Sequence, residues 1–151
     1  MMQVSMAELL PFIQEAFAKN MTFKIPITGT SMNPLLVQGR DYVIIKKPDL
    51  PLETGDLPLY RRDDGAFVLH RVVGKNADGY IMCGDNQFLL EKNITDKHIV
   101  GVVCTICRDG KLMDVTDPEY VKHKNKYVKN LKTRYPVRRL KYTLYRLKNG
   151  K

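Results

Sequence analysis

Three short motifs in the chain carry side chains suited to hydrolysis by an activated serine. Ser31 lies in the stretch ITGTSMNPLL, on a turn bounded by Gly29 and Pro34. A nucleophilic serine needs solvent access, a neighbouring base, and amide donors where an oxyanion forms. A turn of small residues provides access, and the amides around Ser31 are candidate donors. Taken alone, these residues are equally typical of an ordinary turn.

The second motif, AFVLHRVVG at residues 66–74, places His70 in the middle of a predicted strand. A neutral imidazole with a pKa of ~6.5 can accept a hydroxyl proton at cellular pH. The alternative is a structural histidine in the core or at a strand edge, which is the commoner role. His98 precedes a predicted strand and His123 lies in a basic tail, so both are weaker candidates.

The third motif, MCGDNQFLLE at residues 82–91, supplies two carboxylates. Asp85 either orients an imidazole, braces the site through backbone amides, or caps a turn with no catalytic role. Glu91 follows six residues later, and its alternative is a solvated surface acid.

The elements that must position these motifs follow from the residue pattern. Residues 5–19 are predicted to form a helix, because Ser5 to Glu8 matches a capping box and apolar residues recur every three or four positions. Pro11 predicts either a kink or a helix that starts at that proline. From 23 to 115, short β-like runs alternate with turn signals such as NADG and RDGK, which favour hairpins. We therefore expect a mainly β (α+β) fold of curled antiparallel sheets.

The last part of the chain differs in charge. Residues 1–119 hold 13 basic and 16 acidic residues, whereas residues 120–151 hold 12 basic residues and no acidic ones. Asp117-Pro118 predicts a helix start, followed by a helix to about Tyr135 and a second helix opened by Pro136. The sequence thus divides into a β-rich domain at 1–116, with its helix in 1–22, and a basic helical tail at 117–151.

The order of these motifs resembles the signal peptidase family. Ile25-Pro26, Gly-x-Ser-Met-x-Pro, Gly-Asp before a strand ending in Tyr60, His-Arg-Val-Val-Gly and Gly-Asp-Asn follow one another over residues 25 to about 103. The histidine makes the chain similar to the archaeal and endoplasmic-reticulum branch. Autocleaving repressor proteins share the Ser-Met box, but they use a lysine base and carry a preceding DNA-binding domain.

The resemblance implies a serine endopeptidase that cleaves an extended peptide, such as a leader or signal-like segment, after small residues. It implies Ser31 as nucleophile, His70 as general base, and Glu91, where that branch usually has aspartate, as the orienting acid. Asp85 is the aspartate of the Gly-Asp-Asn motif and the second candidate for that role. Gly29, Thr30 and Met32, which lie in the loop that carries Ser31 (the serine loop), would contact the oxyanion and the substrate. The resemblance implies no metal and no cofactor. A non-catalytic peptide- or membrane-binding module of the same fold is the alternative.

The basic tail has three interpretations. Val137, Leu140, Leu144 and Leu147 share one helical face, so residues 136–148 are suited to an anionic membrane surface. Nucleic-acid binding by the interleaved basic and tyrosine residues is the weaker option, and packing of the helix on the body is the third. Three cysteines and the lack of a secretion signal predict a cytoplasmic location, with the tail as a route to the membrane surface.

Overall fold

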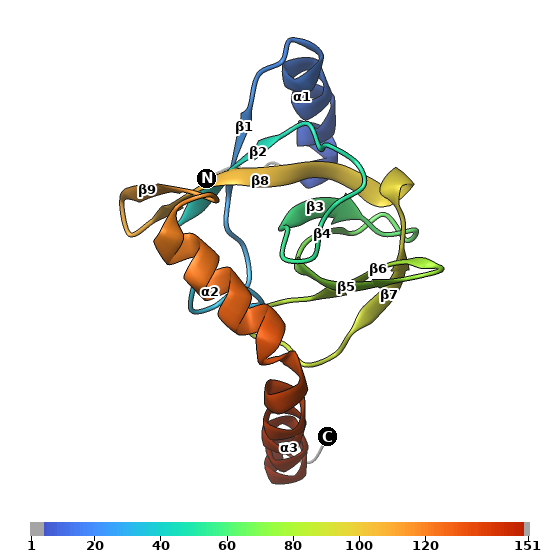
Figure 1. Ribbon diagram of the computed structural model, residues 1–151, viewed down its shortest axis with the longest axis vertical. Coiled ribbons are helices and arrows are strands. Elements are labelled where there is room, and N and C mark those ends of the chain that lie inside the picture. The colour runs from blue at the N-terminus through green and yellow to red at the C-terminus, as the bar shows by residue number, and fades with distance from the viewer. Residues whose placement is uncertain (1–4, 150–151) are drawn as a thin grey trace.

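The N-terminal helix forms as its capping residues predict. The computed structural model describes residues 5–149, and α1 spans Met6–Ala18 (Figure 1). Ser5 Oγ accepts a hydrogen bond from the Glu8 amide at 3.2 Å, and the Glu8 carboxylate accepts one from the Ser5 amide at 2.9 Å. Pro11 lies inside α1. The helix therefore begins at its cap, and the alternative start at Pro11 is wrong.

The larger sheet is antiparallel and branched. Its strands are β1 (Phe23–Pro26), β2 (Tyr42–Lys46), β3 (Pro58–Arg61), β4 (Phe67–Leu69), β8 (Ile99–Arg108) and β9 (Lys111–Asp114). The order is β1-β2-β8-β3-β4, with β9 paired to β8. Register shifts in the pairs that β8 makes with β2 and β3 indicate bulges, which bend a sheet. The strands β1, β4 and β9 each have one partner strand and are the outer strands of the sheet.

A second, three-stranded antiparallel sheet contains β5 (Arg71–Asn76), β6 (Gly79–Cys83) and β7 (Glu91–Ile94). A short 3-10 turn at Asp96–His98 leads from β7 into β8. The predicted NADG and RDGK hairpins both form, as β5–β6 and β8–β9. The expected mainly β, α+β fold is confirmed.

The segment 66–74 differs from its prediction. It was expected to be one strand with His70 in the middle, but it divides at His70 into β4 and β5. The strand β4 pairs with β3 in the larger sheet, and β5 pairs with β6 in the smaller one. His70 therefore lies at the corner where the chain passes between the sheets.

The buried apolar side chains form two clusters, and the larger sheet contributes to both of them. The larger cluster buries side chains from α1, the larger sheet, the serine loop and α2, including Ile13, Met32, Leu36, Ile106 and Tyr120. The smaller cluster includes Leu52, Tyr60, Val72, Tyr80 and Met82. Buried apolar side chains of the serine loop, Met32 and Leu36, thus anchor this loop in the larger cluster.

Two helices complete the described chain, and their boundary differs from the expected one. The helix α2 spans Pro118–Lys129 and is capped by Asp117, as predicted. It ends at Lys129, with Asn130 as its C-cap, and not near Tyr135; α3 spans Leu131–Asn149 with Pro136 inside it. Figure 1 shows α2 lying along the body and α3 at the end of the molecule opposite α1.

Candidate active site

Ser31 lies on a turn within the long loop, residues 27–41, that connects β1 and β2. The amide of Asn33 donates to the carbonyl of Thr30 at 3.1 Å, which closes the turn, and the amide of Leu36 donates to the carbonyl of Met32 at 3.0 Å. Met32 and Leu36 are buried, whereas Ser31 is only half-buried. The apolar neighbours hold the loop and leave the hydroxyl at a cavity.

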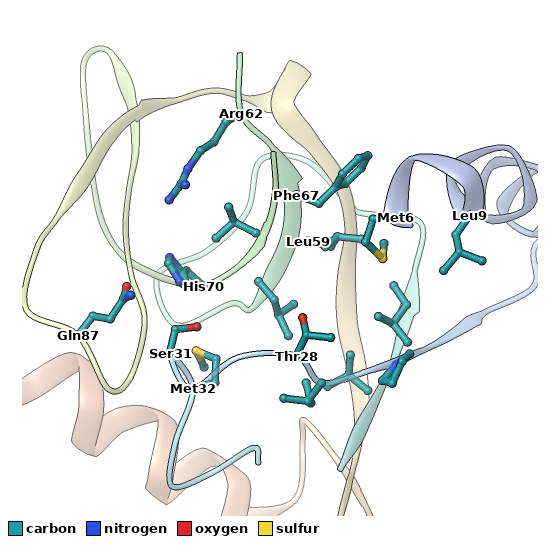
Figure 2. Close-up of a pocket in the computed structure, with 16 residues that line it drawn as sticks. Met6, Leu9, Thr28, Ser31, Met32, Leu59, Arg62, Phe67, His70 and Gln87 are labelled. Carbon is teal, nitrogen blue, oxygen red and sulfur yellow. The ribbon is translucent and has the colours of Figure 1, made fainter. Parts of the chain in front are cut away.

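Ser31 and His70 line the same cavity, which has a volume of about 390 Å³. Figure 2 shows both side chains at one end of it with Gln87 beside them, while Met6 and Leu9 of α1 lie at the other end. Within residues 5–149, no hydrogen bond joins Ser31 Oγ to the His70 ring. Catalytic hydrogen bonds are often loose until substrate binds, so the shared cavity is the informative relationship.

The environment of His70 keeps its imidazole neutral. Burial lowers its pKa, the nearby Arg62 guanidinium lowers it further, and the result is a pKa of about 4. Glu91 and Asp85 act in the opposite direction but do not prevail. At neutral pH the ring is therefore in the form that accepts a proton.

Glu91 reaches His70 through Tyr60. The Tyr60 hydroxyl donates to Glu91 Oε1 at 2.6 Å and lies 3.4 Å from His70 Nδ1. Burial and the bond to Glu91 raise the pKa of Tyr60, so its proton stays in place. Because that proton points to Glu91, the Tyr60 oxygen is left to accept from Nδ1–H. This tautomer leaves Nε2 of His70 unprotonated.

Arg62 holds the Glu91 carboxylate in position. Its Nε donates to Glu91 Oε2 at 2.7 Å and its Nη2 donates to Oε1 at 3.1 Å. Burial raises the pKa of Glu91, but the hydrogen bonds from Arg62 and Tyr60 outweigh it and lower the pKa. Glu91 is therefore an ionised carboxylate behind the histidine, separated from it by one hydroxyl.

Asp85 contacts a different set of residues. Its carboxylate accepts hydrogen bonds from Arg71 Nε at 2.8 Å and Nη2 at 2.9 Å, and both side chains are fully buried. His123 Nε2 of α2 lies 3.5 Å from Asp85 Oδ2. Burial raises the pKa of Asp85, but His123 and Arg71 together lower it to about 2. No hydrogen bond joins Asp85 to His70 in the described chain, so the geometry favours Glu91 over Asp85 as the acid behind the ring.

The Gly-Asp-Asn loop supports the serine turn directly. The amide of Asn86 donates to the Ser31 carbonyl at 2.8 Å, and its side-chain amide donates to the Thr30 carbonyl at 3.1 Å. Asp85 lies between these contacts and the buried Arg71, whose Nη1 also donates to the Gly55 carbonyl at 2.9 Å. The contacts of Asp85 are thus those of a residue that braces the loop of Ser31.

The serine loop also offers candidate oxyanion donors. In the described part of the chain, the amides of Thr30 and Ser31 donate to no protein acceptor. The amide of Gly29 is bonded to the Gln38 side chain and is not available in this way. Two amides are therefore open to a developing oxyanion near Ser31.

Sequence reasoning gave no role at this site to Arg62, Arg71 or Tyr120, and it considered His123 only as a weaker candidate base. Tyr60 and Arg62 are two positions apart, and this spacing puts side chains on the same face of an extended strand. That spacing could have indicated that Tyr60 and Arg62 contact a common partner, which is Glu91. The Tyr120 hydroxyl lies 3.3 Å from Arg71 Nη1, across 49 positions of sequence, and no local pattern indicates such a contact.

The described residues contain no cluster of three or more His, Cys, Asp or Glu side chains that could hold a metal ion. Comparison with known proteins adds no further assignment. No protein-family model, no curated protein and no solved structure matches this chain.

Proposed function

We propose that the chain is a serine endopeptidase of the signal-peptidase type, with Ser31 as nucleophile and His70 as general base. The observation that carries the proposal is the shared cavity of Ser31 and His70, with an ionised carboxylate held behind the ring. A serine, a neutral buried imidazole and an orienting acid are the components of acyl transfer.

The strand edges support an extended substrate. The cavity is lined by Ile25 and Pro26 of β1, and by Phe67 and Leu69 of β4. Both strands are edge strands of the larger sheet, so their outer backbone groups can pair with an added strand. An extended peptide between them would direct alternate side chains into the apolar cavity and its scissile carbonyl toward Ser31.

The chemical steps follow from the tautomer of His70. Nε2 takes the Ser31 proton as Oγ attacks the scissile carbonyl, and the amides of Thr30 and Ser31 stabilise the oxyanion. The same nitrogen then gives the proton to the leaving amine as the peptide bond breaks. Water, activated by His70, attacks the acyl-enzyme ester and releases the acid product and Ser31.

The chain offers a matched control for the test, because it contains two serines, Ser5 and Ser31. We expect a library of extended peptides to be cleaved by the wild type and by Ser5→Ala, and left intact by Ser31→Ala and His70→Ala. Mass spectrometry would identify the cleaved bonds. A serine-reactive phosphonate should label Ser31 and spare Ser5.

A peptide-binding module without catalysis is the second candidate. The lack of a Ser31–His70 hydrogen bond in this structure favours it. It predicts that the peptides bind but are not cleaved, and that Ser31→Ala and His70→Ala leave the affinity unchanged. Cleavage that survives Ser31→Ala would contradict the peptidase assignment.

A further inference from the structure

The helix α3 exposes an apolar stripe. Val137, Leu140, Leu144 and Leu147 share one helical face, and each is more than half exposed. A helix normally buries such a stripe against the body of a protein. Here the stripe has remained open, which indicates that it has an occupant outside this chain.

The charge of α3 limits the chemistry of that occupant. Residues 131–149 contain seven basic residues and no acidic ones, and Arg139, Lys141 and Lys148 are exposed. An apolar stripe in such a basic helix is typical of helices that lie in the plane of an anionic bilayer surface. No helix within residues 5–149 combines the length and apolar character needed to cross a bilayer.

Two other occupants fit less well. A second copy would bring two strongly basic helices together along their stripe, and the like charges would repel. A nucleic-acid backbone would satisfy the cations but leave four aliphatic side chains in water. The lipid interface accommodates both the charges and the stripe.

The helix contacts the Gly-Asp-Asn motif and the loop that follows it. Arg134 Nη1 donates to the Asp85 carbonyl at 2.7 Å, and the rings of Tyr142 and Phe88 lie 5.6 Å apart. The next residue, Leu89, is exposed and lines a surface depression together with Leu147. The loop therefore extends the apolar surface of α3 toward the site.

This surface continues to the histidine. A second cavity, of about 520 Å³, is lined by Leu89, Leu90 and Tyr142 together with His70 and Glu91. The base thus lies between this cavity and the one that contains Ser31. A surface that binds α3 and Leu89 would also lie at the opening of the second cavity.

We propose that α3 and Leu89 bind an anionic lipid bilayer, with α3 in the plane of the surface. Cations of α3 contact the headgroups, and the stripe enters the interface. If the proposed function holds, the substrates are peptide segments presented at that surface next to His70. Binding to lipid itself does not depend on catalysis.

The first test is a co-sedimentation assay of the full-length Ser31→Ala variant. It uses phosphatidylcholine vesicles that either contain or lack phosphatidylglycerol. We expect binding only to the anionic vesicles. Leu144→Gln/Leu147→Gln should weaken it at least tenfold, whereas Phe12→Gln/Leu112→Gln, at equally exposed apolar residues elsewhere, should not. Because the variant has no nucleophile, a failure here is distinct from a failure of the peptidase proposal.

The second test addresses charge. Lys141→Gln/Lys148→Gln should lower the partition coefficient about thirtyfold, since each basic residue contributes about 1 kcal/mol near an anionic surface. Lys92→Gln/Lys97→Gln removes two exposed cations from the body and should have little effect. Equal binding to both vesicle types, or no binding, would overturn the proposal. Dimerisation abolished by the leucine substitutions would overturn it in favour of a second copy.

The third test locates the surface. The chain has no tryptophan, so Leu89→Trp and Leu112→Trp each introduce a single reporter at an exposed leucine. We expect anionic vesicles to shift the emission of the Leu89→Trp protein to shorter wavelength and to leave that of Leu112→Trp unchanged. A shift at both sites, or at the second alone, would contradict the proposed orientation.

Discussion

The Ser31 carbonyl oxygen lies so close to Gly84 that it leaves no room for a side chain at that position. A Cβ at Gly84 would come within 2.7 Å of that oxygen and 3.0 Å of Gln87 Oε1. The first of these is the backbone carbonyl of Ser31, to which the Asn86 amide also donates. The glycine of the Gly-Asp-Asn motif therefore sets how closely the two loops approach.

Gly84→Ala is expected to displace Ser31. We predict a fall in kcat/KM of about a hundredfold, the loss that a displacement of ~1 Å can cause, with a destabilisation of only about 1–3 kcal/mol. Gly74→Ala is the control, because its Cβ would meet only Ile81 Cδ1 at an ordinary 3.7 Å. Peptide cleavage and urea unfolding of both variants would check this. Equal losses of activity would contradict the argument.

The pH dependence should report the low pKa of His70. Peptidase activity needs the neutral imidazole, so kcat/KM should stay level as the pH falls to about 5 and decline through about 4. An exposed histidine would instead give a decline near ~6.5. Initial rates, with circular dichroism to confirm that the protein is folded at each pH, would distinguish the two cases.

The same group makes stability depend on pH. Because the folded pKa of His70, about 4, is below its unfolded value, the unfolded chain binds a proton first as the pH falls. Stability should be highest above ~6.5 and decrease by up to about 3 kcal/mol through pH 4. This decrease should be absent in His70→Gln. Denaturant titrations of both proteins at several pH values would measure it.

Tyr60→Phe tests the link between Glu91 and His70. It removes the hydroxyl that lies between them and leaves the Arg62–Glu91 pair, so the ring loses its partner at Nδ1. We predict about a tenfold or larger fall in kcat and a destabilisation of about 1 kcal/mol. Tyr80→Phe removes another buried hydroxyl bonded to a carboxylate, that of Asp96, away from the site. It should cost similar stability and leave kcat unchanged.

Asp85→Asn tests the buried ion pair. The change leaves the fully buried Arg71 guanidinium uncompensated, which typically costs about 3–5 kcal/mol. The wild-type contribution should be complete above the unfolded pKa of ~3.8 and be lost as the pH falls through about 2, because the folded pKa of Asp85 is depressed. Asp49→Asn, at an almost fully exposed carboxylate, should change stability by no more than about 0.5 kcal/mol.

Local signals predicted the elements that local chemistry determines. The Ser5 capping box, the Asp117 cap and the two hairpin turns all appear where the sequence indicates. The strand β7 was not predicted, because Glu91–Ile94 has the sequence EKNI, with only one β-branched residue. Its position comes from pairing with β6, which is a tertiary interaction.

The division at His70 and the helix boundary at Asn130 depended on the same kind of information. The segment 66–74 has a continuous strand pattern, and only the choice of partner strands separates β4 from β5. Proline at 136 suggested a helix start, whereas the chain turns at Asn130 and continues through the proline. The pattern of residues therefore did not indicate the division of 66–74 into two strands or the position of the helix boundary.

The candidate site shows the same limit. Ser31, His70 and Glu91 could be selected as chemically suited residues, but their geometry depends on Tyr60 and Arg62, which form the connection in space. Asp85 was a candidate for the acid that orients His70, but its carboxylate contacts Arg71 and His123 instead. A contact between positions 85 and 123 cannot be predicted from local sequence, because it depends on the complete fold.

The contact of α2 with Asp85 also has a consequence for the order of events during synthesis. Ser31, His70 and Glu91 leave the ribosome before Tyr120 and His123, which complete the surroundings of the Arg71–Asp85 pair. Folding of a growing chain proceeds from its N-terminal part. A nascent chain that already contains Ser31, His70 and Glu91 thus still lacks the contacts of α2 with the Arg71–Asp85 pair, and the proposed peptidase activity is expected to begin only after α2 has emerged and packed against the body.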